Sequence, residues 1–309
     1  MIQVIAVVGP TGSGKTALGI EIAQALDTEV ISADSMQFYR GMEIGTGAPN
    51  AEELSAVSHH FIGHLSPNQE MSAGDYEIEA CAVVKRLNDS GKPAVVVGGS
   101  GLYIRTLVDG LFDGPSKDQA IRDRLEAEAE HDGIATLYAR LKKVDPEYAK
   151  IISKNDLRRI VRALELFEIA GEPASVQYAR HQASLDGFSS LQFLIDFPRK
   201  KLYDRINRRV DMMLDMGLVD EVKALVEQGY AADIMRLKSL GYREILSYVQ
   251  GERPYEEAVE LMKMYTRRYA KRQLTWFRGD ERVNFMSTTE HPDNTSRLEH
   301  VLEVHRAKG

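Results

Sequence analysis

The residues best suited to chemistry form a glycine-rich run close to the N-terminus: Gly9, Pro10, Thr11, Gly12, Ser13, Gly14, Lys15 and Thr16. This run matches the phosphate-binding pattern G-x-x-x-x-G-K-[ST] in full, between an apolar segment and a helical one. Its glycines let backbone N–H groups face an anion, the following helix N-terminus adds partial positive charge, and Lys15 adds a full charge. The Thr16 hydroxyl can bind Mg²⁺. The run therefore predicts a site for a diphosphate or a triphosphate, and it leaves open which ester binds.

A carboxylate and a hydroxyl follow two other strand-like segments. Asp34 comes just after Glu29–Ser32, and Ser100 follows Ala94–Val97 through two glycines. Ligands of α/β sheets bind at the carboxyl ends of the strands, where Asp34 can serve as a general base or a Mg²⁺ contact. Each residue also has a structural alternative, because Asp often caps a helix and Gly98-Gly99 can form a tight helix-entry turn. No Asp closes the second segment, where a nucleotide hydrolase usually carries one.

The elements that must position these residues alternate between strands and helices. The predicted strands are Ile2–Val8, Glu29–Ser32 and Pro93–Val97, with helices at Thr16–Leu26 and Tyr76–Ser90. Another strand is expected at Leu191–Phe197, and beyond Arg199 the chain reads as helices broken at Gly217, Gly229, Gly241, Gly251 and Pro254. This alternation predicts the α/β class, with a P-loop NTPase-like parallel sheet flanked by helices.

The segment from Pro115 to Leu185 has a different pattern. Its apolar residues recur at helical spacing, as in the series Ile160, Leu164 and Phe167, and no strand-like run interrupts them. We therefore expect an all-helical insertion domain over residues 115–189, and a discontinuous α/β core domain built from residues 1–114 and 190–309.

The charge distribution permits a polyanionic partner on one part of the surface. The 309-residue chain has a net charge of −7, but residues 199–278 hold 17 Lys and Arg against 12 Asp and Glu. Local potential attracts a polyanion, although such residues also solvate ordinary helix surfaces. The single cysteine, Cys81, excludes an internal disulfide, and no apolar run approaches the roughly 20 residues of a membrane span. With no export signal at the N-terminus, we expect a cytoplasmic protein.

Seven motif-bearing segments follow one another along the chain. They are GPTGSGKT at residues 9–16, ISADSMQFYRGMEIGTGAP at 31–49, VVVGGSGLYI at 95–104, NDLRRIVRALE at 155–165, GLVDEV at 217–222, SLGYREI at 239–245 and TRRYAKRQLTWFR at 266–278. In this order and spacing they resemble the tRNA dimethylallyltransferase family, from residue 4 to about residue 280. The resemblance implies transfer of a dimethylallyl group from dimethylallyl diphosphate to N6 of adenosine 37, next to the anticodon of a tRNA, with release of diphosphate.

On the donor side, the resemblance implies that the glycine-rich run holds the diphosphate, with Mg²⁺ bound at Thr16. Lys15, Thr16 and Arg209 would neutralise the leaving group, so that the allylic C–O bond ionises towards a carbocation-like state without hydrolysis. Asp34 matches the family position that accepts the proton from the adenine N6. Arg205 and Arg209 lie at i, i+4 and share one helix face, on which Arg209 is the expected diphosphate contact.

On the RNA side, the target adenosine must leave its stack to enter the pocket, where it would meet Asp34, Ser35, Met36 and Gln37. Further tRNA contacts are implied at Ser100, Arg122, Arg158, Arg159, Ile160, Val161, Arg162, Lys238, Ser239, Leu240, Gly241, Tyr242 and Arg243. Cations and aromatic residues alternate over residues 265–278, where they either stack on bases or form the buried side of a helix. We expect a monomer that binds the anticodon stem-loop.

Two positions depart from the family pattern. Gly47-Ala48-Pro49 stands where the family often has Ala-Lys-Pro, which puts any role of the Gly45–Pro49 turn in doubt, and Ser100 replaces Thr but keeps the hydroxyl. The histidines between His59 and His64 have no neighbouring Cys or aligned carboxylate, and we expect them in a loop rather than at a metal. Two other function classes fit parts of the sequence: a small-molecule kinase with an Arg-rich lid, and a non-catalytic RNA-binding ATPase.

Overall fold

The computed structural model describes residues 2–110, 115, 117–184 and 187–308, and the chain divides into two compact units. The first unit comprises Met1–Val108 and Gly187–Gly309, and the second comprises Asp109–Asp186. The N–H of Phe188 donates to the carbonyl oxygen of Val108 at 3.1 Å, so the two ends of the first unit meet where the second begins and ends. These bounds differ by a few residues from the division expected at residues 115 and 189.

A six-stranded parallel sheet forms the centre of the first unit, in the order β3-β2-β4-β1-β5-β6. The strands are β1 Val4–Val8, β2 Val30–Ser32, β3 His59–His60, β4 Ala94–Gly98, β5 Ser190–Asp196 and β6 Val283–Ser287. The expected α/β class and the parallel sheet are confirmed.

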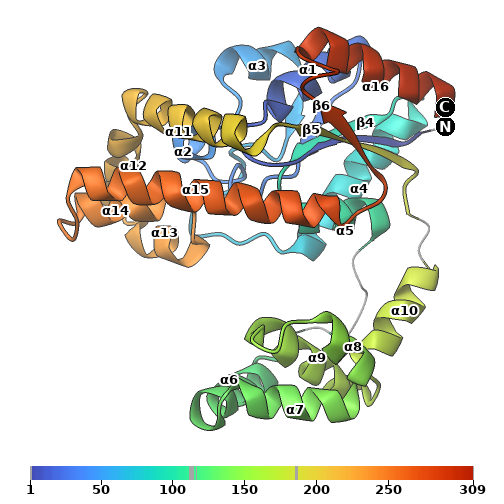
Figure 1. Ribbon diagram of the computed structural model, residues 1–309, viewed down its shortest axis with the longest axis vertical. Helices are drawn as coiled ribbons and strands as arrows, with labels where there is room; N and C mark the ends of the chain where they lie inside the picture. Colours follow the sequence, from blue (N-terminus) through green and yellow to red (C-terminus); the bar gives the residue numbers. More distant parts are fainter. Residues whose placement is uncertain (1, 111–114, 116, 185–186, 309) are drawn as a thin grey trace. The chain divides into compact units, whose positions relative to one another are not determined.

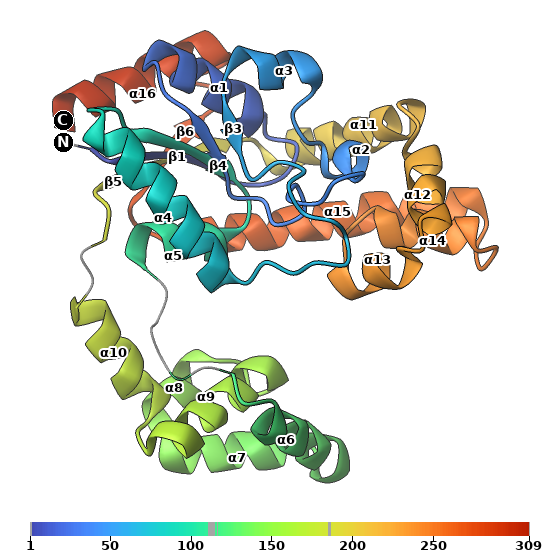
Figure 2. The same cartoon turned by 180° about the vertical axis from the view of Figure 1, so that it is seen from behind.

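Helices cover both faces of this sheet (Figures 1 and 2). The helices of the first unit are α1 Lys15–Ala25, α2 Glu43–Thr46, α3 Ala51–Ala56, α4 Ala73–Asp89, α5 Gly101–Asp109, α11 Arg199–Asp215, α12 Leu218–Glu227, α13 Ala231–Leu237, α14 Tyr242–Val249, α15 Tyr255–Arg278 and α16 Asn294–Lys308. Strand β1 shows why two layers are needed, because successive side chains of a strand point to opposite faces. Ile5 and Val7 pack with α1 and α16, whereas Val4, Ala6 and Val8 pack with the layer that contains α4 and α5.

The sequence prediction missed the two edge strands, began the helix predicted at Tyr76–Ser90 three residues late, and placed the helix breaks beyond Arg199 correctly. An edge strand pairs on one side only and lacks the continuous apolar run of a central strand: β3 is two half-buried histidines, and β6 exposes Phe285. The histidines at residues 59 and 60 therefore lie in the sheet rather than in a loop. The expected breaks at Gly217, Gly229, Gly241, Gly251 and Pro254 all fall between helices.

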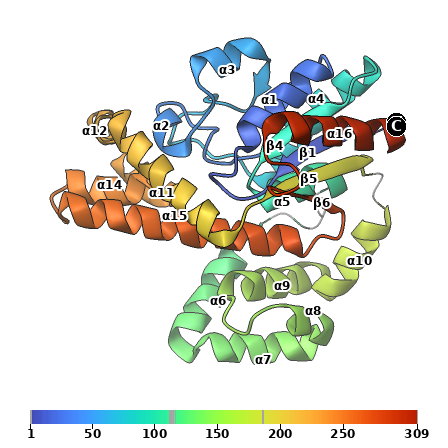
Figure 3. The same ribbon diagram turned by 45° about the horizontal axis from the view of Figure 1, so that its top comes forward.

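The second unit is helical throughout its described residues (Figure 3). It contains α6 Gln119–Asp132, α7 Ile134–Val144, α8 Pro146–Ile151, α9 Leu157–Ala170 and α10 Ala174–Ser184. Its own apolar core includes Leu125, Leu137, Leu141, Ile160 and Leu164. Across the described part of the chain, no helix is long and apolar enough to cross a lipid bilayer.

Candidate active site

The glycine-rich run forms a loop between β1 and α1. Gly9, Gly12 and Gly14 have φ angles of +126°, +79° and +90°, in the region that favours glycine. Helix α1 starts at Lys15 with no side-chain cap and no acidic residue in its first turn, so its N–H groups remain available to an anion. Inside the loop, the Ser13 hydroxyl and the Lys15 ammonium both donate to the Pro10 carbonyl, at 2.9 and 2.8 Å. The strand–loop–helix context predicted for a phosphate site is present.

Helix α11 closes one side of this loop. Nε of Arg205 donates to the Gly12 carbonyl at 2.8 Å, and a Cβ on Gly12 would lie 3.2 Å from the side chain of Ile206. One turn further along α11, Nη2 of Arg209 donates to the Gly47 carbonyl at 3.3 Å. The i, i+4 pair expected from the sequence therefore contacts the glycine-rich loop through Arg205 and the Gly45–Pro49 turn through Arg209.

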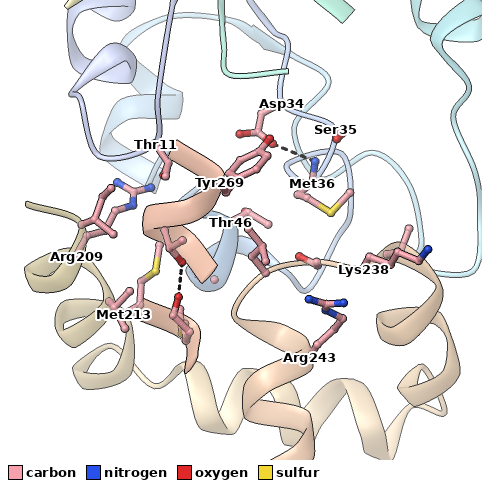
Figure 4. Close-up of a pocket in the computed structure, with 18 of the residues that line it drawn as sticks. Thr11, Asp34, Ser35, Met36, Thr46, Arg209, Met213, Lys238, Arg243 and Tyr269 are labelled. Carbon is pink, nitrogen blue, oxygen red and sulfur yellow. Dashed lines mark hydrogen bonds between the residues drawn. The ribbon is translucent and has the colours of Figure 1, made fainter. Parts of the chain in front are cut away.

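A cavity of about 410 Å³ lies at the carboxyl end of the sheet, beside this loop. Figure 4 shows Thr11, Asp34 and Arg209 around one part of it, and Lys238 and Arg243 around another. The loop after β2, helix α2, α11, the α13–α14 junction and α15 all supply lining residues. The cavity thus brings together one wall with an acid and an arginine, a second basic wall, and apolar side chains between them.

Asp34 lines the cavity and interacts electrostatically with Lys15 of the loop, and burial shifts the pKa of both. Burial raises the pKa of Asp34, although the N–H of Met36, which donates to Oδ1 at 3.1 Å, and the charges of Lys15 and Arg209 act in the opposite direction. Burial also lowers the pKa of Lys15 to about 8, against the raising effect of Asp34. Perturbed acid–base pairs of this kind concentrate at functional sites.

Arg209 is a half-buried cation with unused hydrogen-bonding capacity. Its pKa is lowered by burial, which the negative charges of Asp34 and Glu53 partly offset. Its Nε is buried without a hydrogen-bond partner among the described residues. Leaving a charged donor unpaired is costly, so a guanidinium held in this state is well prepared to bind an anion.

Two residues of α15 belong to the site: Gln273, which was not predicted from the sequence, and Tyr269, which was predicted only as part of the basic and aromatic run at residues 265–278. Oε1 of the buried Gln273 accepts from the N–H of Thr11 at 2.9 Å, and its Nε2 donates to the Gly99 carbonyl at 2.9 Å. One turn earlier, Tyr269 lines the cavity, and burial together with the charge of Asp34 raises its pKa to about 12. The i, i+4 spacing of Tyr269 and Gln273 is the sequence signal that could have identified them as neighbours on one helix face, but basic residues of the same helix obscure it.

The structure brings part of the predicted RNA-contacting set to this cavity. Asp34, Ser35 and Met36 line it together with residues 238–240 and Arg243. Gln37 and Ser100 do not line the cavity, and both make hydrogen bonds within the protein. Oε1 of Gln37 accepts from Ser32 and its Nε2 donates to the Gly47 carbonyl, while the Ser100 hydroxyl accepts from the N–H of Ser35.

The burial of three predicted RNA contacts requires a correction. Tyr242 and Ile160 are fully buried and Val161 is nearly so, so none of these side chains can reach an RNA. These residues belong to their motifs as parts of the protein core, whereas their exposed neighbours in the sequence face solvent.

The arginines of the second unit divide into two groups. Arg122 and Arg162 both donate to the buried carboxylate of Glu165, at 2.8 and 2.7 Å, whereas Arg158 and Arg159 are exposed. Burial alone would raise the pKa of Glu165, but these hydrogen bonds and one from the N–H of Asp118 bring it to about 2. Arg122 and Arg162 therefore hold this unit together, and Arg158 and Arg159 remain accessible to an anion.

The Thr16 hydroxyl is compatible with the expected Mg²⁺. Thr16 lies half-buried in the first turn of α1, and no cluster of three or more His, Cys, Asp or Glu that could bind a metal occurs among the described residues. Mg²⁺ commonly binds through few protein oxygens and completes its shell with phosphate oxygens and water. The donor set therefore fits an ion that arrives with a diphosphate.

Comparisons with known proteins agree with this geometry. A model of the family described as IPP transferase matches residues 37–280. The tRNA dimethylallyltransferase 1 of Trichlorobacter lovleyi is 41% identical over 296 residues, which cover 96% of each chain. The tRNA dimethylallyltransferase of Acetivibrio thermocellus is 43% identical, with 94% of this chain and 93% of the relative covered.

Solved structures show the same likeness in three dimensions. The full-length tRNA isopentenylpyrophosphate transferase of Bacillus halodurans has a TM-score of 0.67 and 35% identity, over 98% of this chain and 99% of that one. A eukaryotic dimethylallyltransferase acting on tRNA has a TM-score of 0.77 and 29% identity, over 92% of this chain and 73% of that one. Since the family model and these relatives span most of the sequence, this chain belongs to the IPP transferase family.

Proposed function

We propose that this protein transfers a dimethylallyl group from dimethylallyl diphosphate to N6 of adenosine 37 in a tRNA and releases diphosphate. The observation that carries the proposal is one cavity in which Thr11 of the phosphate-binding loop, Asp34 and Arg209 meet a second basic wall. Membership of the family supplies the reaction class. We propose that it acts as a monomer in the cytoplasm, where its proposed tRNA substrate is used.

The donor half of the reaction needs stabilisation of a leaving diphosphate. In our proposal residues 9–16 hold the diphosphate, and Lys15 and Arg209 bind its oxygens as the C–O bond breaks and the electron pair moves to the leaving group. Mg²⁺ at Thr16 would add charge neutralisation when bound. The apolar lining from Val210, Met213 and Met262 would receive the prenyl chain.

The acceptor half needs a base, because the N6 lone pair of adenine is delocalised into the ring. As N6 bonds to the allylic carbon, one N6 proton passes to the carboxylate of Asp34. The hydrogen bond from the Met36 N–H orients that carboxylate. The raised pKa of Asp34 makes it a better proton acceptor than an ordinary aspartate, provided that it stays ionised.

Basic and aromatic side chains around the cavity support an RNA acceptor. Lys238 and Arg243 line it, and the guanidinium of Arg272 lies over the ring of Tyr269. Such pairs suit unstacked bases and phosphates, and an adenosine of the anticodon loop can reach the cavity only after it flips out of its stack. We propose that the anticodon stem-loop also contacts Arg158 and Arg159 of the second unit.

Replacement of Asp34 tests the proposed base. We expect Asp34→Ala and Asp34→Asn to slow single-turnover transfer by about 10²- to 10⁴-fold, the usual contribution of a general base, and to leave tRNA affinity nearly unchanged. Mass spectrometry of nucleosides from tRNA incubated with Mg²⁺ and dimethylallyl diphosphate would measure the product. An unchanged single-turnover rate together with lost tRNA binding would contradict the assignment.

A ligand comparison separates the proposal from the kinase alternative. The ligand that the folded state prefers raises the melting temperature most. We expect dimethylallyl diphosphate to protect the wild-type protein more than ATP does. Stronger protection by ATP, with no prenylated adenosine formed, would favour the phosphoryl-transfer class.

A further inference from the structure

The turn from Gly45 to Gly47 lies between the cavity and two side chains that contact it from the other side, the half-buried Glu221 and the buried Tyr242. Gly45 and Thr46 line the cavity, and the Gly47 carbonyl accepts from Nη2 of Arg209 and from Nε2 of Gln37, each at 3.3 Å. On the side of the cavity, the turn thus contacts the arginine that we assign to the diphosphate.

On its other side, the turn forms hydrogen bonds with Glu221 of α12. Its Oε2 accepts from the N–H of Ile44 at 2.8 Å, and its Oε1 accepts from the N–H of Gly45 at 3.1 Å. The hydroxyl of Tyr242, at the start of α14, donates to the same Oε1 and lies 3.0 Å from the N–H of Gly45. Helix α2 has only four residues and no N-cap side chain of its own, so this carboxylate satisfies N–H groups that would otherwise be unpaired.

Neighbouring side chains pack closely against the glycines of the turn. A Cβ on Gly45 would overlap the ring of Tyr242, and a Cβ on Gly47 would overlap the guanidinium of Arg209. Tyr242 is fully buried, so it cannot retreat. A shift of the turn would therefore move the Gly47 carbonyl and with it the hydrogen bond that holds Arg209.

We propose that Glu221 and Tyr242 are positioning residues for the transfer reaction, which hold the Gly45–Gly47 turn so that its carbonyl orients Arg209 towards the diphosphate. This inference rests on the proposed function. It gives the Gly45–Gly47 turn a role that does not require a lysine to contact the phosphate. It also gives the GLVDEV and SLGYREI motifs a shared role, since Glu221 belongs to the first and Tyr242 to the second.

The carboxylate is suited to this role because it only accepts hydrogen bonds. Burial raises the pKa of Glu221, and the donors from Tyr242, Ile44 and Gly45 oppose that rise. An amide of the same size has one oxygen and one NH₂ group, so Glu221→Gln places a donor against at least one backbone N–H. The variant therefore displaces the turn while it keeps the packing volume.

Steady-state kinetics of Glu221→Gln and Tyr242→Phe test the proposal. We expect each to raise KM for dimethylallyl diphosphate by about ten-fold, the effect of one misplaced charge-assisted hydrogen bond, with tRNA affinity unchanged. Asp220→Asn is the matched control, because Asp220 is exposed on the same helix and pairs with Lys223 at 3.1 Å. A loss that lowers kcat alone, in proportion to the fraction of active protein, would show a merely structural role and overturn the proposal.

A double-mutant cycle tests whether Glu221 acts through Arg209. If Glu221 acts by orienting that guanidinium, Glu221→Gln should add little to the defect of Arg209→Gln, and additive defects would overturn the route. If the wild-type protein transfers no dimethylallyl group, the proposed function fails. The positioning role is then judged by whether Glu221→Gln weakens the protection that Mg²⁺ and inorganic diphosphate give against thermal unfolding, and equal protection would refute it.

Discussion

At the scale of single residues, burial acts on Lys15 and Asp34 in opposite senses. A low-dielectric site disfavours the charged form of each, so the pKa of Lys15 falls to about 8 and that of Asp34 rises. The attraction between the two opposite charges limits both pKa shifts. The free enzyme therefore holds a lysine and an aspartate whose titrations lie closer to neutral pH than in water.

These shifts predict a bell-shaped pH dependence of kcat/KM for dimethylallyl diphosphate. The value of kcat/KM should fall as pH rises past about 8, because neutral Lys15 no longer attracts the diphosphate. It should also fall on the acid side, below the raised pKa at which Asp34 gains a proton. Rates at saturating tRNA over a pH series would measure both limbs. Lys15→Arg should extend the alkaline limb, since arginine stays charged, and an alkaline limb that does not move would count against Lys15.

At the scale of secondary-structure elements, the second unit depends on one buried carboxylate. Glu165 of α9 has a fully buried side chain and accepts hydrogen bonds from Arg122 of α6 and from Arg162 of its own helix. Its carboxylate also accepts from the N–H of Asp118, just before α6. These contacts join two helices whose apolar faces form part of the same core.

Removal of this carboxylate should destabilise the second unit. Glu165→Ala leaves two arginines without their partner, and we expect a loss of about 3–5 kcal/mol in the free energy of unfolding, as for other broken buried ion pairs. Urea unfolding followed by circular dichroism would measure it. Because the folded pKa is about 2 and the ordinary value is 4.5, the stabilisation should be complete above pH 4.5 and disappear towards pH 2. Wild-type stability that is flat over that range would contradict this account.

At the scale of the whole molecule, the chain consists of a first unit that contains the proposed active site and an inserted second unit. The insertion leaves the first unit at Val108 and returns at Gly187, and the hydrogen bond between Phe188 and Val108 shows that these ends are adjacent. Each unit has an apolar core of its own. The first unit holds every residue that lines the proposed donor site, so donor binding and RNA binding can be separated by experiment.

Replacement of residues 109–186 by a short Gly-Ser linker tests this separation. We expect the shortened protein to fold, because the linker joins ends that already meet, and to remain protected by dimethylallyl diphosphate against thermal unfolding. It should lose at least about ten-fold in tRNA affinity, since phosphate contacts such as those proposed for Arg158 and Arg159 dominate binding to nucleic acids. Filter binding at fixed salt would measure the affinity. Full tRNA affinity in the shortened protein would refute a role of the insertion in RNA binding.

Local patterns in the sequence predicted the elements well. The strand–loop–helix at Gly9–Thr16 and the helix ends at glycines depend on neighbouring residues only, and both are present in the structure. The two edge strands escaped because they lack an apolar run of their own. Residues 238–243, which include the first five residues of the motif SLGYREI, were interpreted as RNA contacts, yet Tyr242 is buried. A motif marks a residue type at a position, and it does not distinguish a residue that binds from one that supports.

The sequence by itself determined the α/β class, the phosphate-binding loop, the acid after the second strand and the family, because each is written in residues that are close together along the chain. Only the tertiary structure decided which distant residues complete the site. Gln273 meets Thr11, and Glu221 meets Gly45, across separations that no periodicity encodes. Such contacts arise when helices pack onto the sheet, and that packing depends on the shape of the whole core rather than on any one segment.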